Sequence, residues 1–231
     1  RSNIQSITIP YGFTSVKQGF VPSIPVIDFT SAKDIQFSNT FQDNGTLREI
    51  TFGDGAKIGG SMFRGAGNVS IIRIADNATV IFPADVNPFY DFRGLDKFII
   101  GDGATVRFER NKTFDITMAN AVRVRLSEIL IGDNATVYFG YNTFNGEPSL
   151  TTIKFGKNGN YTFEQSAFKG CTALENIIIP EGSTVTINGN AFENCTALKE
   201  IFLPSSITSI PANAFVGCSS LESVALMGVT S

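Results

Sequence analysis

The chain has 231 residues, a formal net charge of −3 and no histidine. So weak a charge excludes electrostatic recognition of nucleic acid or of an anionic membrane surface as the main activity. Without histidine, neither a Ser-His or Cys-His nucleophile pair nor a histidine-based zinc site can form. No stretch of 18 apolar residues is present, so we expect no membrane-spanning segment.

One apolar pattern recurs through the whole chain. The template is apolar-x-x-apolar-x-apolar, and its best copy is the segment 198–203. Neighbouring copies start 20 to 31 residues apart, which is the spacing of a repeat protein. The first positions of the copies are residues 4, 24, 47, 69, 95, 126, 150, 174, 198 and 221. We therefore predict a β-rich (α/β) solenoid of about ten coils, wound as a right-handed superhelix, with a parallel β-sheet along one face. Residues 1–231 then form one domain.

Within each coil, a compact turn is expected before the strand. Phe168, Cys171 and Leu174 lie three residues apart, and Phe192, Cys195 and Leu198 repeat the spacing, as do the residues at 215, 218 and 221. Three-residue spacing places side chains on one face of a short helical or 3₁₀ turn. The stretch 104–126 departs from this pattern, and we expect an irregular, longer coil there with an inserted loop at about 111–118.

A tight turn and a second short strand are expected after each first strand. Asp54, Asp76, Asp102 and Asp133 share one turn position and are followed by Gly or Asn, which tolerate the positive φ of tight turns. A stacked column of carboxylates could hold Ca²⁺, but the alternating spacing of a calcium loop is absent. Turn geometry is the simpler interpretation, and the sequence leaves calcium binding open. The second strands are expected at 80–82, 106–108, 137–139 and 185–187.

The segment 191–204, with the sequence AFENCTALKEIFLP, resembles the repeat of BspA-like (Treponema-type) bacterial leucine-rich repeat proteins. The resemblance is best over residues 143–231 and looser upstream. It implies an extracellular or cell-surface protein, with its signal peptide removed, that adheres to host matrix proteins or to other cells. The family shares no catalytic residue, so the resemblance implies no enzymatic activity, no cofactor and no metal.

Three cysteines, Cys171, Cys195 and Cys218, occupy the same repeat position. We interpret them as a column of small buried hydrophobic residues. A disulfide between neighbouring coils stays possible, although an odd number of inward-pointing cysteines argues against a disulfide framework.

The strand face is the candidate binding surface. The fifth position of the template should point outward and should be polar if only water covers it. In three successive coils it is Ile178, Phe202 and Ala225, and Ile99 and Leu130 form a second apolar pair. Exposed apolar patches often mark interaction sites. We expect Ile178, Phe202 and Ala225 to bind a partner, within a charged rim formed by Glu175, Lys199 and Glu200.

Three functions remain open from the sequence. The first is a non-catalytic surface module that binds a protein ligand, or alternatively a glycan, through the strand face. The second is a structural spacer or stalk of a larger surface protein. The third is a carbohydrate-active β-helix enzyme, which would need several acidic or basic side chains converging on one face.

Overall fold

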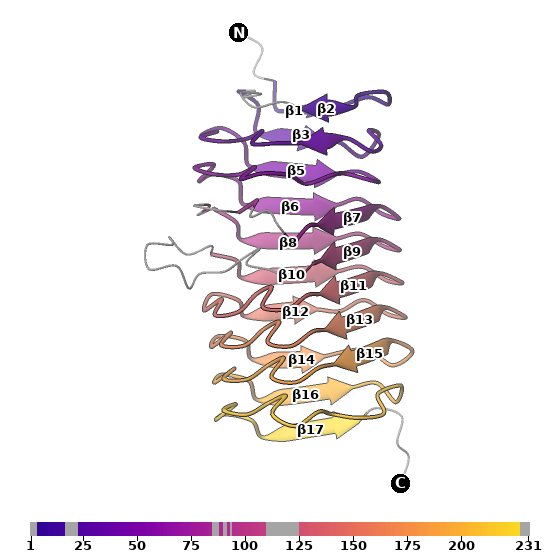
Figure 1. The fold of residues 1–231 in the computed structure, drawn as a ribbon, viewed down its shortest axis with the longest axis vertical. Helices are drawn as coiled ribbons and strands as arrows, with labels where there is room; N and C mark the ends of the chain where they lie inside the picture. Colours follow the sequence, from indigo (N-terminus) through magenta and orange to yellow (C-terminus); the bar gives the residue numbers. More distant parts are fainter. Residues whose placement is uncertain are drawn as a thin grey trace.

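A computed structural model describes residues 4–16, 23–84, 88–89, 92, 94–109 and 125–226. The chain winds into a solenoid, and the two termini lie at opposite ends of the stack (Figure 1). One strand from each coil joins a ten-stranded sheet, called here the first sheet, in which every neighbouring pair is parallel. In order, its strands are β1 (Ser6–Thr8), β3 (Val26–Asp28), β5 (Glu49–Phe52), β6 (Ile71–Ile74), β8 (Lys97–Ile100), β10 (Glu128–Ile131), β12 (Thr152–Lys154), β14 (Asn176–Ile178), β16 (Glu200–Leu203) and β17 (Ser223–Leu226).

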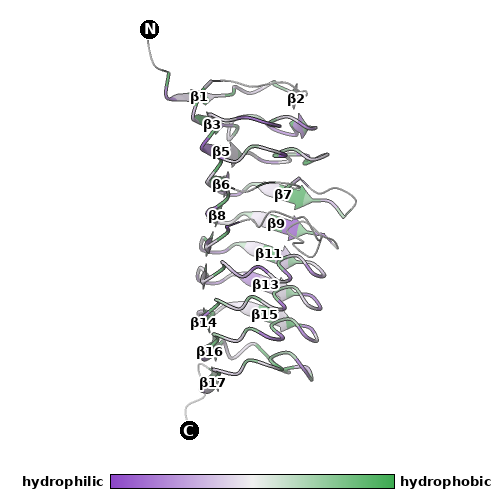
Figure 2. Ribbon diagram, turned by 90° about the vertical axis from the view of Figure 1, so that its left-hand side faces the viewer, coloured by the Kyte–Doolittle hydropathy of each residue, from purple (hydrophilic) through white to green (hydrophobic). Residues whose placement is uncertain are grey.

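A second run of strands lies on another side of the coils (Figure 2). Five of them, β7 to β15, form a parallel sheet, and two shorter strands nearer the N-terminus pair with each other. Lys57 connects the two groups through single bridges to Gln36 and Ile81. The strands are β2 (Ser15–Val16), β4 (Gln36–Phe37), β7 (Thr79–Phe82), β9 (Thr105–Phe108), β11 (Thr136–Phe139), β13 (Asn160–Phe163) and β15 (Thr184–Ile187).

The expected solenoid is confirmed, but the number of complete coils is smaller than ten. About eight turns are complete, because the coils of β16 and β17 contribute to the first sheet but have no described strand in the second. The irregular coil expected at 104–126 lies mostly in residues 110–124, outside the described residues, so its inserted loop is not tested.

Strand register explains why the template repeats. In the first sheet Ile129 is paired with Phe98 on one side and with Ile153 on the other, so the fourth template position of every coil falls in one inward column. The residues of this column from β3 to β16 are buried. Because no coil can bury its own apolar face, each one depends on its neighbours for a core.

Stacked phenylalanines fill the rest of the core. In the turns, the ring of Phe168 lies between those of Phe144 and Phe192, with centroids 5.0 and 5.6 Å apart and the planes within 14° of parallel. A second stack follows the inner side of the second sheet, where Phe108 and Phe139 are 6.0 Å apart at 7°. Parallel coils bring identical residues into contact, which favours such ladders of like side chains.

The compact turns before the strands are not helices, which corrects the expectation of helical or 3₁₀ turns. No helix occurs in the described part of the chain. Two residues four apart, such as Ser166 and Gly170, have positive φ and interrupt any helical path. Single turn bonds join Cys171 N to Phe168 O and Leu174 N to Cys171 O, so the three-residue spacing arises from successive β-turns. Other amides of the turn donate to the next coil instead, as Phe168 N does to Ala191 O at 2.8 Å.

Candidate functional site

The outward face of the first sheet, here called the strand face, has the central column that the sequence predicted. Each residue of the column pairs with its counterpart in the neighbouring strand, so the side chains follow one line along the solenoid. From β3 to β17 the column is Asp28, Thr51, Arg73, Ile99, Leu130, Lys154, Ile178, Phe202 and Ala225. The outward position of these residues in the fold is therefore confirmed.

The C-terminal end of this column is apolar and open to solvent. Ile178 is 51% exposed, and its neighbours in register, Phe202 and Ala225, are half-buried. We call these three residues the C-terminal patch. In the same column, Lys154 lies between the patch and Leu130. Leu130 and its upstream neighbour Ile99 are half-buried too.

The three charged residues that the sequence proposed as the rim of the patch lie within or just before β14 and β16. Glu175, Lys199 and Glu200 are all exposed. Lys199 Nζ lies 3.6 Å from Glu175 Oε2, so these two charges form a loose ion pair between neighbouring coils. Such an exposed pair contributes little to stability and leaves both groups available to a partner.

The same face has a different chemistry upstream. Arg73 and Glu49, on neighbouring strands, form an ion pair, and Lys97 Nζ donates to Glu128 Oε2 at 2.8 Å. The hydrogen bond to Glu128 raises the pKa of Lys97 above its usual value, with the charge of Glu128 adding to the effect. Here the outward charges are matched to one another within the chain.

The aspartate column of the tight turns forms a hydrogen-bonded ladder. Asp76 Oδ1 accepts the backbone N–H of Asp102 at 3.0 Å, and Asp102 Oδ1 accepts that of Asp133 at 2.8 Å. In the same way, Asp54 Oδ1 accepts the backbone N–H of Thr79, and Asp133 Oδ1 accepts the backbone N–H of Lys157. Each carboxylate thus caps the next coil, and within the described residues no group of three or more acidic or cysteine side chains is arranged to hold a metal ion.

The residue that packs against each of the Asp76 and Asp102 carboxylates from the next coil must be glycine. A Cβ on Gly132 would lie 2.3 Å from Asp102 Oδ1 and 2.7 Å from the backbone carbon of Gly101. The residue after each Asp adopts positive φ, as Asn77, Gly103 and Asn134 show. The Asp-Gly and Asp-Asn pairs therefore perform the turn function that the sequence predicted.

The cysteine column is buried, as expected, and holds free thiols. Cys195 Sγ donates to the carbonyl oxygen of Phe168 at 3.2 Å, and Cys171 and Cys218 make the equivalent bond to the phenylalanine one coil earlier. Burial raises the pKa of the Cys171 thiol far above its usual value. These sulfurs are structural donors between coils, and no disulfide joins them.

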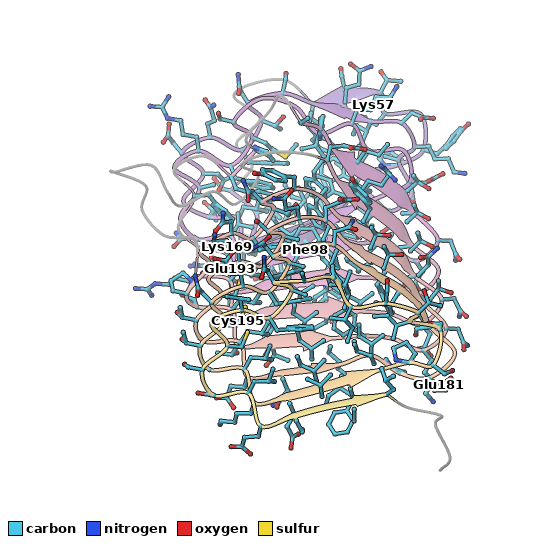
Figure 3. All side chains as sticks on the ribbon, turned by 60° about the horizontal axis from the view of Figure 1, so that its bottom comes forward. Lys57, Phe98, Lys169, Glu181, Glu193 and Cys195 are labelled. Atoms are coloured by element: carbon cyan, nitrogen blue, oxygen red, sulfur yellow. The ribbon has the colours of Figure 1, made fainter. Side chains whose placement is uncertain are left out.

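On the outside of the turns, charged groups also connect neighbouring coils. Lys169 Nζ lies 2.9 Å from Glu193 Oε2, and Figure 3 places the two side chains next to each other. The hydrogen bond from Lys169 lowers the pKa of Glu193. Glu181 accepts from the hydroxyl and the amide of Ser205, which lowers the pKa of its carboxyl. These shifted groups are spread over several coils and do not converge on one point.

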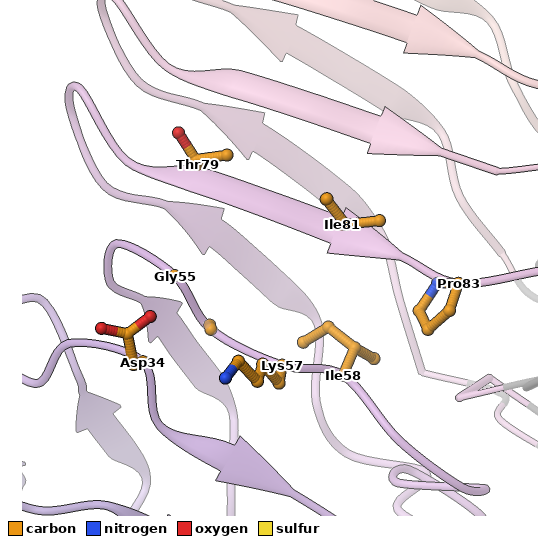
Figure 4. Close-up of a pocket in the computed structure, with 8 residues that line it drawn as sticks. Asp34, Gly55, Lys57, Ile58, Thr79, Ile81 and Pro83 are labelled. Carbon is orange, nitrogen blue, oxygen red and sulfur yellow. The ribbon is translucent and has the colours of Figure 1, made fainter.

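Sequence reasoning missed a shallow depression of about 290 Å³ beside the second sheet (Figure 4). It lies where the coil after β5 makes only the single bridges of Lys57 in place of a strand. Its wall includes Asp34, Thr79, Pro83 and Ile81, which is 43% exposed. The only signal in the sequence was the Lys57-Ile58-Gly59-Gly60 segment, which lacks the alternation of the other second strands.

Among the described residues there is no helix long and apolar enough to cross a membrane. A comparison with curated proteins gave no match. Among solved structures, a leucine rich cell surface protein from Faecalibacterium prausnitzii A2-165 is 18% identical, with 99% of this chain and 89% of that chain covered and a TM-score of 0.37. A leucine-rich repeat protein from Bacteroides ovatus ATCC 8483 is 17% identical, with 97% and 87% covered and a TM-score of 0.36. The pneumococcal vaccine antigen PcpA is 13% identical, with 97% and 78% covered and a TM-score of 0.34.

A protein-family model matches most of the chain. Six copies of the model described as BspA type leucine rich repeat region cover residues 1–101 and 123–231. The unmatched residues, 102–122, overlap most of the stretch 104–126 where the sequence predicted an irregular coil. The strand register and the stacked phenylalanines of the structure follow the same repeat that the family model matches. The chain therefore belongs to the BspA-type leucine-rich repeat family.

Proposed function

We propose that this chain is a non-catalytic binding module of a secreted or cell-surface protein, and that it holds a protein partner on the C-terminal patch. The observation that carries the proposal is the exposure of Ile178, at 51%, in the middle of a strand-face column that continues in register into Phe202. Exposed apolar side chains that adjoin one another on a surface often mark an interaction site.

The surroundings of the patch support a protein partner. Protein interfaces commonly combine an apolar centre with a polar, solvent-accessible rim. Glu175, Lys199 and Glu200 are exposed next to the strands that carry Ile178 and Phe202, and the pair of Lys199 with Glu175 is looser, at 3.6 Å, than that of Lys97 with Glu128, at 2.8 Å. The family resemblance supports an extracellular or cell-surface location and adhesion to host matrix proteins or other cells.

The test is a binding screen of the purified chain against immobilised matrix proteins, cell-surface proteins and glycans. Phe202→Arg introduces a charge into the patch, whereas Thr51→Arg places the same charge in the same column, far from the patch. We expect a protein hit that Phe202→Arg loses and Thr51→Arg retains, with both variants folded by circular dichroism. Binding that the folded Phe202→Arg chain retains in full would remove the strand-face proposal.

Two other results would favour the alternative functions. If no ligand binds and binding by the longer protein maps to residues outside this chain, the chain is a spacer. If only glycans bind and sugars are released from them, the chain is a carbohydrate-active solenoid.

A further inference from the structure

The depression beside Lys57 has a polar end and an apolar end. Figure 4 shows the side chain of Lys57 extending toward Asp34, with Thr79 on the same side of the depression. Ile81 and Pro83 lie on the opposite side. The volume of about 290 Å³ is close to the lower limit of small-molecule sites, which commonly measure about 300–1,000 Å³. The depression therefore has the size and the polarity for a small amphipathic ligand.

The polar end presents two opposite charges that the described part of the chain leaves without a partner. Lys57 is exposed and belongs to none of the ion pairs between described residues. The aspartates of the tight-turn ladder, such as Asp54, each accept a backbone N–H from the next coil. The exposed carboxylate of Asp34 accepts no such bond from any described residue, and it does not pair with Lys57. One cation and one anion are thus available to a ligand at the same end of the depression.

The apolar end contains a large aliphatic residue at an outward position where the rest of the second sheet is more polar. Ile81 is 43% exposed. The residues that follow it in register along the sheet are Arg107, Tyr138, Thr162 and Thr186. Ile58 and Pro83 line the depression next to Ile81, and no aromatic side chain is among its lining residues. The surface that fits this end is therefore an aliphatic side chain.

The backbone keeps the depression open. Lys57 makes only single bridges to its neighbours, in place of the longer pairing that β7 has with β9. Gly55, one of the lining residues, has a φ of 71°. A Cβ at Gly55 would lie 2.5 Å from Asp34 Oδ1, so a side chain there would be strained and would displace the carboxylate. The absence of a side chain at Gly55 therefore leaves the Asp34 carboxylate in place at the polar end.

We propose that the depression binds a free α-amino acid with an aliphatic side chain. Lys57 binds the carboxylate of the ligand, and Asp34 binds its α-ammonium group. The hydroxyl of Thr79 donates a further hydrogen bond to the ligand carboxylate, while the aliphatic side chain lies against Ile58 and Ile81. A free amino acid matches the two charges because it carries both on one carbon atom, whereas a peptide bond removes one of them. The inference goes beyond the proposed binding function and uses none of its residues.

The test is a titration of the isoleucine-labelled 231-residue chain with leucine, followed by methyl NMR. We expect the methyl resonances of Ile58 and Ile81 to shift saturably, while that of Ile178 on the strand face stays unchanged. Glycine should bind about tenfold more weakly or worse, because it makes no apolar contact. Leucinamide lacks the carboxylate and N-acetylleucine lacks the ammonium group, so both should bind more weakly than leucine. The absence of a saturable shift up to the solubility limit of leucine would overturn the proposal, as would equal binding of leucine and any of these three analogues.

Three conservative variants and one control locate the site. Lys57→Gln and Asp34→Asn each remove one charge, and asparagine tolerates the φ of 53° at position 34. Each should weaken leucine binding by about fivefold, as expected for the loss of one solvent-exposed ion pair. Ile81→Thr introduces the residue that Thr162 and Thr186 place at the same register position, and it should also weaken binding. Lys157→Gln makes the same charge change at an exposed lysine of another turn and should bind leucine normally. Unchanged affinity in Lys57→Gln and Asp34→Asn, with both folded by circular dichroism, would contradict the proposal.

Discussion

The strand face has two regions with the same backbone and different outward chemistry. From β5 to β10, the central column includes the half-buried Ile99 and Leu130, but charges on neighbouring strands neutralise each other around them, as in the pairs Glu49–Arg73 and Lys97–Glu128. From β14 to β17, the central column is apolar and Ile178 is half exposed. The inward columns are continuous across both regions, so the difference does not arise from the demands of folding. The repeat therefore specifies the core, while the outward residues vary from coil to coil.

Substitutions in the core should lower the free energy of unfolding the most, and by similar amounts in both regions. Phe63→Ala and Phe168→Ala each remove a fully buried, stacked ring, and we expect each to lower the free energy of unfolding by about 3–5 kcal/mol. Chemical denaturation monitored by circular dichroism measures this change. Phe202→Ala, on the strand face, serves as the control and should cost about 1 kcal/mol or less, within the range of most surface changes. A comparable loss for Phe202→Ala would mean that the patch belongs to the core.

A smaller effect is expected at the tight turns of the upstream region. Gly132→Ala would force its Cβ against Asp102 and the backbone of the preceding coil, and overpacking of this kind costs about 1–3 kcal/mol. Gly67→Ala is the control, because a Cβ there would meet no atom within 4 Å. Equal melting temperatures for the two variants would contradict the close stacking of the turns.

Removing one carboxylate of the aspartate ladder should lower the free energy of unfolding by less than the glycine substitution does. Asp102→Ala removes the acceptor for the Asp133 amide and should cost about 0.5–2 kcal/mol, the range for comparable capping side chains. Asp102→Asn keeps an oxygen acceptor and should recover most of this loss in thermal unfolding. Adding Ca²⁺ should leave the melting temperature unchanged; a clear rise that Asp102→Asn abolishes would show that the column binds calcium instead.

The smallest effect should be the pH dependence of the ion pair on the upstream strand face. Glu128 raises the pKa of Lys97 above 10.5, so the stabilisation is present below that pH and is lost as the pH rises through the raised value. The melting temperature of the unaltered chain should exceed that of Glu128→Gln slightly near neutral pH, and the difference should shrink in strong alkali. High salt should also reduce it. A difference that persists unchanged in alkali would assign the role of Glu128 to something other than Lys97.

Sequence reasoning predicted the parallel solenoid because a single template specified both the inward columns and the outward ones. It also placed Ile178 and Phe202 correctly on one outward line, since strand alternation and repeat register are regular. It failed at the turns containing Phe168 and Cys171, because a three-residue spacing fits a helix as well as successive β-turns. The positive φ at Ser166, which decides between them, has no signal in the residue type.

The hydrogen bonds between coils could not be predicted from the sequence either. The bond from Cys195 to the Phe168 carbonyl and the Asp102 ladder depend on the exact stacking of turns that lie more than 20 residues apart. The depression beside Lys57 has the same origin, since it results from a coil whose second strand is reduced to single bridges. Such features arise from contacts between coils and cannot be read from one repeat alone.

The most direct test of the central claim is the affinity of a protein that the binding screen selects for three variants along the strand-face column, measured by calorimetry. Ile178→Arg and Phe202→Arg should each weaken binding by about tenfold or more, as expected for residues at the centre of an interface. Thr51→Arg, in the upstream region, should bind like the unaltered chain. Equal affinity for all three variants, or a loss confined to Thr51→Arg, would contradict the assignment of binding to the C-terminal patch.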